Sequence, residues 1–185
     1  PDLTFNSVGA FVTLQDAFVA KVNVSGTALQ YAGYIGGAGS EGGEVMGIAV
    51  DGAGHAYVTG DTTSTEATFP ATVGPDLTFN GLTDAFVAKV NVSGTALDYA
   101  GYIGGAGFDL GAGIAVDGAG NAYVVGNTTS TEPTFPATVG PDLTFNGTST
   151  MYDAFVAKVN ALGTSLDYAG YVGGDGGEFA FGIAV

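Results

Sequence analysis

A nearly verbatim internal repeat constrains the fold of this chain more than any other feature. The segment DAFVAKV starts at three positions that are 68 and 69 residues apart: Asp16, Asp84 and Asp153. GIAV and PDLTFN also occur three times each, at Gly47, Gly113 and Gly182 and at Pro1, Pro75 and Pro141. A regular period of this length predicts a repeat architecture, in which similar supersecondary units stack on one another.

The composition favours β-structure within each unit. Of 185 residues, 33 are Gly, and the sequence has no Cys and no Trp. Val, Thr, Tyr, Phe and Gly dominate, whereas the usual helix formers are scarce, as expected for strands joined by tight turns. No segment approaches the run of about 20 apolar residues that a membrane-spanning helix needs.

The charge balance narrows the classes of partner. The net charge is −15, because 18 acidic residues stand against 3 basic ones. Such a surface repels phosphate backbones and anionic membranes, so we expect no nucleic acid partner and no direct membrane insertion. Two interpretations of the charge stay open, solubility through self-repulsion and the binding of divalent cations.

One period of the sequence contains four candidate strands. Residues 113–117 and 121–127 flank an Asp-Gly turn, which is a strong hairpin signal. Residues 153–160 form the third strand, with Phe155, Ala157 and Val159 on one face, and residues 165–173 form the fourth. We therefore predict one four-stranded antiparallel sheet per repeat.

We predict an all-β fold of β-propeller blades with a repeat period of about 66–69 residues. A β-sandwich is the alternative, but it does not explain why one four-strand unit recurs. The expected division is a partial blade with strands three and four (1–46), two full blades with their linkers (47–112 and 113–181), and the first strand of a following blade (182–185). Because propellers close with about 4 to 8 blades, this chain should form an incomplete ring.

The amino-acid sequence of the repeat shows a resemblance to a known family. DAFVAKVN, LDYAGYIGG, GIAVDGAGNAYVVGNT and TFPAT, in this order, resemble the bacterial SBBP-type β-propeller repeat across essentially the whole chain. The resemblance implies repeats of large secreted or surface-attached proteins, beside adhesive or structural modules. It implies no shared catalytic residues.

The strand order places the long connections on one face. Turns after strands one and three are short, whereas the connections after strand two span residues 61–83 and 127–152. Loops longer than about 12–15 residues usually carry function or local structure. We expect local structure or blade-to-blade contact there, with a surface for a ligand or partner as the alternative.

Acidic residues in the Gly-rich linkers are candidate calcium ligands. Residues 104–109 read GGAGFD and resemble the start of a calcium-binding nonapeptide, although the element appears only once per period. Hard oxygen ligands are available in or near the linkers: Glu41, Glu44, Asp109, Asp175 and Glu178. Apart from this calcium hypothesis we expect no cofactor.

The other polar residues of the repeat favour turns over catalysis. Asp51 and Asp117 open the DGAG turns, and His55, the only histidine, occupies the position of Asn121 in the next repeat. The recurring Asp16, Asp84 and Asp153 precede the third strand, where a turn or edge role is expected. We predict no catalytic residue, because the near-identical units lack the asymmetry on which propeller enzymes rely.

Four Asn-x-Ser/Thr sequons are candidate N-glycosylation sites: Asn23, Asn91, Asn127 and Asn146.

The sequence thus favours a non-catalytic propeller segment of a secreted or cell-surface protein. We expect it to act as a scaffold, an adhesive module or a subunit of an extracellular assembly, ring or filament. Its partners would be further blades of the same polypeptide, other copies of itself, or an extracellular protein or glycan. The alternative function is a lectin-like ligand-binding propeller that uses the long connections, with or without calcium.

Overall fold

The computed structural model describes residues 4–5, 14–43, 46–148 and 150–185, and their regular structure is entirely β. The strands of these residues are β1 (Ala17–Val22), β2 (Leu29–Ile35), β3 (Gly47–Val50), β4 (Ala56–Thr62), β5 (Asp84–Val90), β6 (Leu97–Ile103), β7 (Asp109–Val116), β8 (Ala122–Thr128), β9 (Asp153–Val159) and β10 (Leu166–Val172). The part of the chain that is described has no helix able to cross a membrane.

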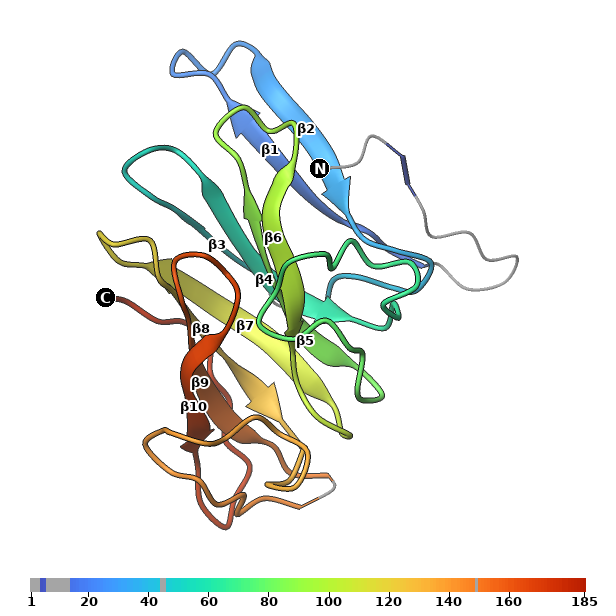
Figure 1. Ribbon diagram of the computed structural model, residues 1–185, viewed down its shortest axis with the longest axis vertical. Helices are drawn as coiled ribbons and strands as arrows, with labels where there is room; N and C mark the ends of the chain where they lie inside the picture. The colour runs from blue at the N-terminus through green and yellow to red at the C-terminus, as the bar shows by residue number, and fades with distance from the viewer. Residues whose placement is uncertain (1–3, 6–13, 44–45, 149) are drawn as a thin grey trace.

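Three antiparallel sheets follow one another along the chain (Figure 1). Strands β1 and β2 form a two-stranded sheet, and the two four-stranded sheets have the orders β3-β4-β5-β6 and β7-β8-β9-β10. Each four-stranded sheet therefore is an up-and-down meander, as predicted for a blade. The sheets do not close into a ring, which confirms the all-β, incomplete propeller-like fold.

The two complete sheets share one register. Ala56 pairs with Val90 in the first, and Ala122 pairs with Val159 in the second. Counting these first pairs, each register runs through seven residue pairs and ends at the Asp that starts the third strand of the blade, Asp84 or Asp153. A one-residue slip would turn every buried side chain to the wrong face, so the buried pattern fixes this register.

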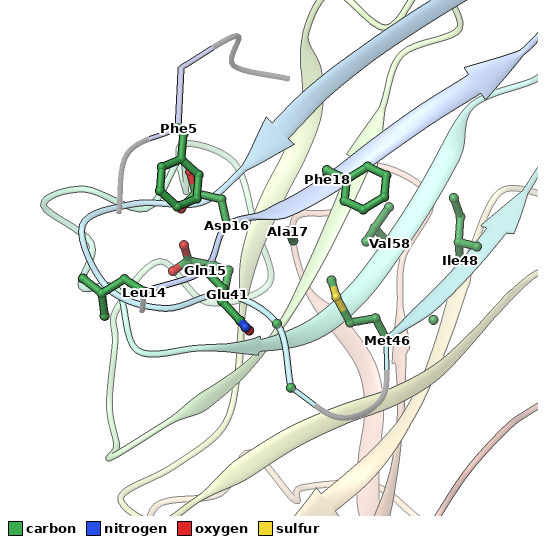
Figure 2. A pocket seen from close by; sticks show the side chains of 13 residues that line it. Phe5, Leu14, Gln15, Asp16, Ala17, Phe18, Glu41, Met46, Ile48 and Val58 are labelled. Atoms are coloured by element: carbon green, nitrogen blue, oxygen red, sulfur yellow. The ribbon is translucent and has the colours of Figure 1, made fainter. Parts of the chain in front are cut away.

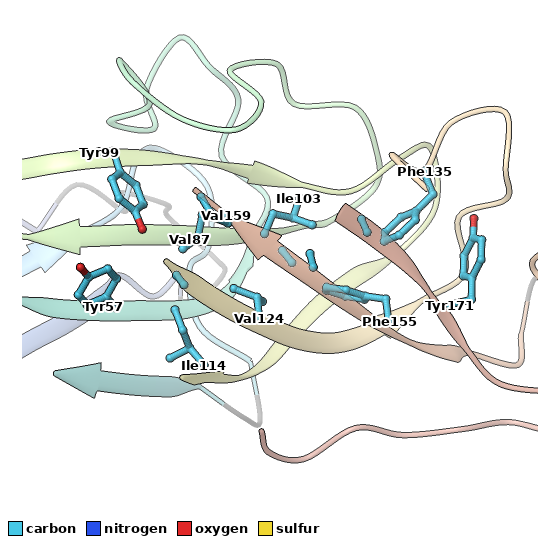
Figure 3. Close-up of a cluster of buried hydrophobic side chains, with 14 residues drawn as sticks. Tyr57, Val87, Tyr99, Ile103, Ile114, Val124, Phe135, Phe155, Val159 and Tyr171 are labelled. Carbon is cyan, nitrogen blue, oxygen red and sulfur yellow. The ribbon is translucent and has the colours of Figure 1, made fainter. Parts of the chain in front are cut away.

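The hydrophobic core lies between neighbouring sheets rather than within one of them. Strand β5 shows why, because its alternate residues serve two different clusters. Phe86 and Ala88 belong to the cluster shared with β1 and β2, whereas Ala85 and Val87 belong to the cluster shared with β7 to β10. Figure 3 shows the second cluster. Every internal blade is thus buried on both faces.

Glycines allow the first strands of successive blades to approach closely. A Cβ atom placed on Gly47 would lie 2.9 Å from the Gly113 Cα, and one placed on Gly113 would lie 2.9 Å from the Gly182 Cα. The three GIAV segments therefore stand in one row, each against the next.

Two strand predictions differ from the structure by more than one residue. Residues 182–185 are predicted as a first strand but form no strand. Strand β7 begins at Asp109, four residues before the expected Gly113. The extension pairs Asp109 with Thr128 across a bulge between Gly111 and Gly113.

Candidate functional site

The long connections after strand two cover the outer edge of their own blade. In the first complete blade, Ala100 N donates to Val73 O at 2.7 Å and Tyr102 N donates to Asp76 O at 2.9 Å. In the second, Val139 and Asp142 bridge the equivalent positions of β10. An uncovered edge strand would offer its backbone groups to another chain. These connections therefore have defined local structure, as we expected.

Phenylalanines anchor the same connections in the core. Phe69 and Phe135 are each only 3% exposed. The Phe69 ring lies 5.1 Å from the Tyr102 ring, and the Phe135 ring lies 5.1 Å from the Tyr171 ring. These phenylalanines therefore face the blade and not solvent.

Each Gly-rich linker docks on the connection of the following blade. Gly39 N donates to Ser64 Oγ at 2.8 Å, and Gly107 N donates to Ser130 Oγ at the same distance. We call this side of the molecule the connection face; it is formed by residues 36–43, 62–83, 104–109, 128–148, 150–152 and 173–178. The linker and the connection hold two blades together there, so the connection face is also a blade-to-blade joint.

A buried carboxylate, Asp109, lies at the centre of this joint. Its side chain is 0% exposed. It accepts hydrogen bonds from Gly105 N at 2.8 Å, from Ser130 Oγ at 2.7 Å and from Thr128 Oγ1. The carboxylate therefore ties the linker to the first residues of the next connection.

A second buried carboxylate, Asp84, faces Asp109. A Cβ atom placed on Gly104 would lie 2.8 Å from Asp84 Oδ1 and 2.9 Å from Asp109 Oδ2. Asp84 is also 0% exposed, and its Oδ2 accepts a hydrogen bond from Asn80 N at 2.9 Å. Its Oδ1 is buried without a hydrogen-bond partner. The space beside Gly104 is therefore lined by two carboxylates.

The other repeats place carboxylates in the same way. Beside Gly173, an added Cβ atom would lie 2.8 Å from Asp153 Oδ1 and 2.9 Å from Glu178 Oε2. Asp153 is 0% exposed, and its Oδ1 also is buried without a hydrogen-bond partner. Beside Gly36, the neighbours are Asp16 and Glu41. Each repeat thus joins the Asp of its third strand to an acid of its linker.

Burial shifts the pKa values of these acids upward. Desolvation, followed by the charge of Asp109, raises the pKa of Asp84 to about 7. Desolvation also raises the pKa values of Asp109 and Asp153. Lys89 and Lys158, in contrast, pair with Asp98 and Asp167, which lie towards the opposite end of the blades. Those two lysines do not balance the buried acids.

The residues predicted as calcium ligands lie in different environments. Glu41, Asp109 and Glu178 occupy equivalent positions in the three acid pairs. Asp175 is exposed, and Glu44 lies outside the described residues. Across the part of the chain that is described, no group of three or more His, Cys, Asp or Glu residues is arranged around a common metal position.

Sequence reasoning missed the partners of these candidates. Asp16, Asp84 and Asp153 were assigned to turn or edge roles because each precedes a strand, but Asp84 and Asp153 are buried against the linker acids. The available signal was the recurrence, in every repeat, of one acid before strand three and another in the linker.

The opposite side of the blades, which carries the turns after strands one and three, has the predicted turn structure. Asp51 Oδ1 accepts hydrogen bonds from Ala53 N, Gly54 N and His55 N, at 2.8 to 3.0 Å. His55 Nδ1 lies 2.8 Å from Asp51 Oδ2, just as Asn121 Nδ2 donates to Asp117 Oδ2 at 2.8 Å. His55 is therefore a turn residue.

The four sequons differ in accessibility. Asn23 and Asn91 hold the turns after strand three, where Asn23 Oδ1 accepts from Thr27 N and Asn91 Oδ1 accepts from Thr95 N. Asn146 is exposed. Asn127 is only 8% exposed, and its Oδ1 accepts a hydrogen bond from Ala180 N at 2.7 Å. Asn127 is thus poorly placed for modification in the folded chain.

An apolar cavity of about 630 Å³ opens beside the two-stranded sheet (Figure 2). Phe18, Met46, Ile48 and Val58 contribute to its walls. Phe18 is 71% exposed, whereas its counterparts in the complete blades, Phe86 and Phe155, are at most 1% exposed. The surface around Phe18 is therefore a blade surface without the cover that a complete blade has.

Comparison with known proteins agrees with this architecture. The family model described as SBBP, beta-propeller repeat, matches residues 98–132, which run from β6 through β7 and β8 into the following connection. No curated protein matches the chain.

Proposed function

We propose, from the premise that this chain carries SBBP-type beta-propeller repeats, that it is a non-catalytic building block of a secreted or cell-surface assembly. In this role it acts as a scaffold or adhesive module rather than as an enzyme. The observation that carries the proposal is the contrast between Phe18, which is 71% exposed, and its buried counterparts Phe86 and Phe155. We infer that another blade covers this surface in the assembly.

The repeated joint between blades supports the same role. The Tyr31 ring packs on Gly94 of the next blade, and the Tyr99 ring packs on Gly163 of the blade after that. Tyr168 holds the equivalent position in the last described blade and is half-buried. In the proposed assembly, further blades repeat this contact.

The repetition of blades also gives the assembly its mechanism of binding. Identical surfaces at a regular spacing present the same weak site many times, and linked weak sites gain avidity over a single one. This mode of action requires no unique residue, in agreement with the near-identity of the repeats.

The lectin-like alternative has less support. A ligand site on the long connections would benefit from exposed aromatic rings, whereas Phe69 and Phe135 pack inward with 3% exposure. The main-chain groups of these connections are also used to cover the outer strands.

Solution mass and shape test the proposal. Light scattering with negative-stain imaging should find particles of several copies, closed or filamentous, rather than single chains of 18.2 kDa. Phe18→Asp should weaken the association, whereas Val24→Asp should not, because Val24 is a fully exposed turn residue. A chain that stays at 18.2 kDa over the whole concentration range would contradict the proposal.

A further inference from the structure

The connection face holds two pairs of acids that take part in no salt bridge among the described residues. In each pair the Asp that starts strand three is completely buried and has one carboxylate oxygen without a hydrogen-bond partner, namely Asp84 Oδ1 and Asp153 Oδ1. The burial of an unpaired charge or polar oxygen is costly, and native proteins normally provide a partner. The two orphan oxygens, Asp84 Oδ1 and Asp153 Oδ1, therefore each lack an expected partner.

Further oxygen atoms surround each orphan oxygen. A Cβ atom placed on Gly81 would lie 2.6 Å from Gly107 O and 2.8 Å from Asp84 Oδ1, and Gly105 O is closer still. In the next repeat, a Cβ atom placed on Gly147 would lie 2.5 Å from Met151 O and 3.0 Å from Asp153 Oδ1. Both orphan oxygens thus have a second carboxylate on one side. On another side, Asp84 Oδ1 has two backbone carbonyls, whereas Asp153 Oδ1 has one, next to the Phe145 ring.

The chemistry of these atoms selects a hard cation. Carboxylate and backbone carbonyl oxygens are the ligands that Ca²⁺ takes, in flexible sets of about 6–8 oxygens that often include water. Mg²⁺ needs a near-ideal octahedron and prefers to keep several waters, which an irregular cradle of glycine carbonyls suits less well. The linker acid is Asp109 in one repeat and Glu178 in the next, so a carboxylate is kept although its length changes.

We propose that the Asp84–Asp109 pair and the Asp153–Glu178 pair each bind one Ca²⁺ ion. The two carboxylates supply the charge, and backbone carbonyls with water complete the ligand set. This arrangement is consistent with the absence of a three-acid cluster from the described residues. Because Asp84 starts β5 of one blade and Asp109 starts β7 of the next, an ion between them would tighten the blade-to-blade joint. The inference does not depend on the proposed scaffold function.

Equilibrium dialysis with radioactive calcium tests the inference directly. With only two carboxylates per site, we expect dissociation constants of about 0.1–1 mM, the weak end of protein calcium sites. The double variant Asp84→Asn/Asp153→Asn keeps the side-chain shape and should lose about two ions per chain. Asp98→Asn/Asp167→Asn is the matched control, because it removes the same charge from acids that are 41% and 42% exposed.

A second variant keeps the test valid if the buried substitutions prevent folding. Glu178→Gln changes a half-buried side chain and should lose about one ion while circular dichroism shows the same β-structure. Calcium should also raise the melting temperature of the unmodified chain, and a chelator should lower it.

Two results would overturn the inference. One is an unmodified chain that binds no calcium, and the other is full binding in the folded double variant. If each pair instead shares a proton, the double variant would be more stable than the unmodified chain in chelator and calcium would have no effect on either.

Discussion

Asp117 holds the turn between β7 and β8 through a single carboxylate. The Asn121 side-chain amide, the backbone N–H groups of Asn121 and Ala119, and the Tyr123 hydroxyl all donate to it. These hydrogen bonds, led by the Asn121 amide, lower the pKa of Asp117 from 3.8 to about 2. The folded chain thus favours the ionised form of this group.

A depressed folded pKa predicts a specific loss of stability in acid. The contribution of Asp117 is complete above the unfolded pKa of 3.8 and disappears as the pH falls through about 2. We therefore expect Asp117→Asn to lower the melting temperature at neutral pH, and the difference from the unmodified chain to shrink between these two values. Melting curves over a pH series measure this difference.

Asp175→Asn is the control for this series, because Asp175 is exposed and holds no turn. Its melting temperature should follow that of the unmodified chain at every pH. A constant difference for Asp117→Asn from neutral pH to about 2 would show that the ionised carboxylate is not the cause.

Sequence alone predicts the residues that act within their own turn. Asp51, Asp117 and His55 were placed correctly because their partners lie within six residues in the chain. The pairing of Asp84 with Asp109 depends instead on how a linker docks across a finished blade. No local pattern encodes that contact, so only the fold reveals the acid pairs.

At the scale of elements, the turns after strand three join the blades. Gly163 has a φ of +75°, and a Cβ atom placed on it would penetrate the Tyr99 ring of the preceding blade. Gly26, in the equivalent turn of the first sheet, has a φ of +71° but has no atom within 4 Å of such a Cβ position. A comparison of substitutions at Gly163 and Gly26 therefore separates the cost of backbone strain from the cost of lost contact between blades.

We expect both substitutions to alanine to destabilise the chain, but unequally. The left-handed backbone costs a non-glycine residue about 1–2 kcal/mol in either turn. Gly163→Ala should cost about 1–3 kcal/mol more, because it forces the Tyr99 ring out of a packed joint. Urea unfolding measures both costs, and equal values would contradict a packing role for this turn.

The ends of a strand could be predicted almost to the residue where its apolar side chains alternate or where turn residues flank its apolar run. Strand β9 starts at the predicted Asp153 and ends one residue early, because DAFVAKV alternates between two buried faces. The pairing of the long connection with β10 could not be foreseen, since it uses backbone groups of Val139 and Asp142 and leaves no side-chain period. The start of β7 at Asp109 could not be predicted for a similar reason, because the glycine-rich sequence before Gly113 predicts a linker.

At the scale of the whole molecule, each sheet depends on its neighbours for burial. The core clusters lie between sheets, so an internal blade is covered on both faces and an end blade on one. This arrangement makes stability a sum of blade and joint contributions, as in other repeat proteins. The same substitution should then have a very different effect at an internal blade and at an end.

Phe18 and Phe86 provide that comparison, because they occupy the same repeat position, Phe18 in the first sheet and Phe86 in the internal blade. Phe86 is 0% exposed and lies 5.5 Å from the Phe69 ring, so Phe86→Ala should cost about 3–5 kcal/mol at any protein concentration. Phe18 is 71% exposed, so Phe18→Ala should cost less than about 0.5 kcal/mol in dilute solution. If another blade covers Phe18 in the assembly, the cost of Phe18→Ala should rise as the chain is concentrated. Urea unfolding at low and high protein concentration measures both variants, and a cost for Phe18→Ala that is small at every concentration would mean that this surface joins no other blade.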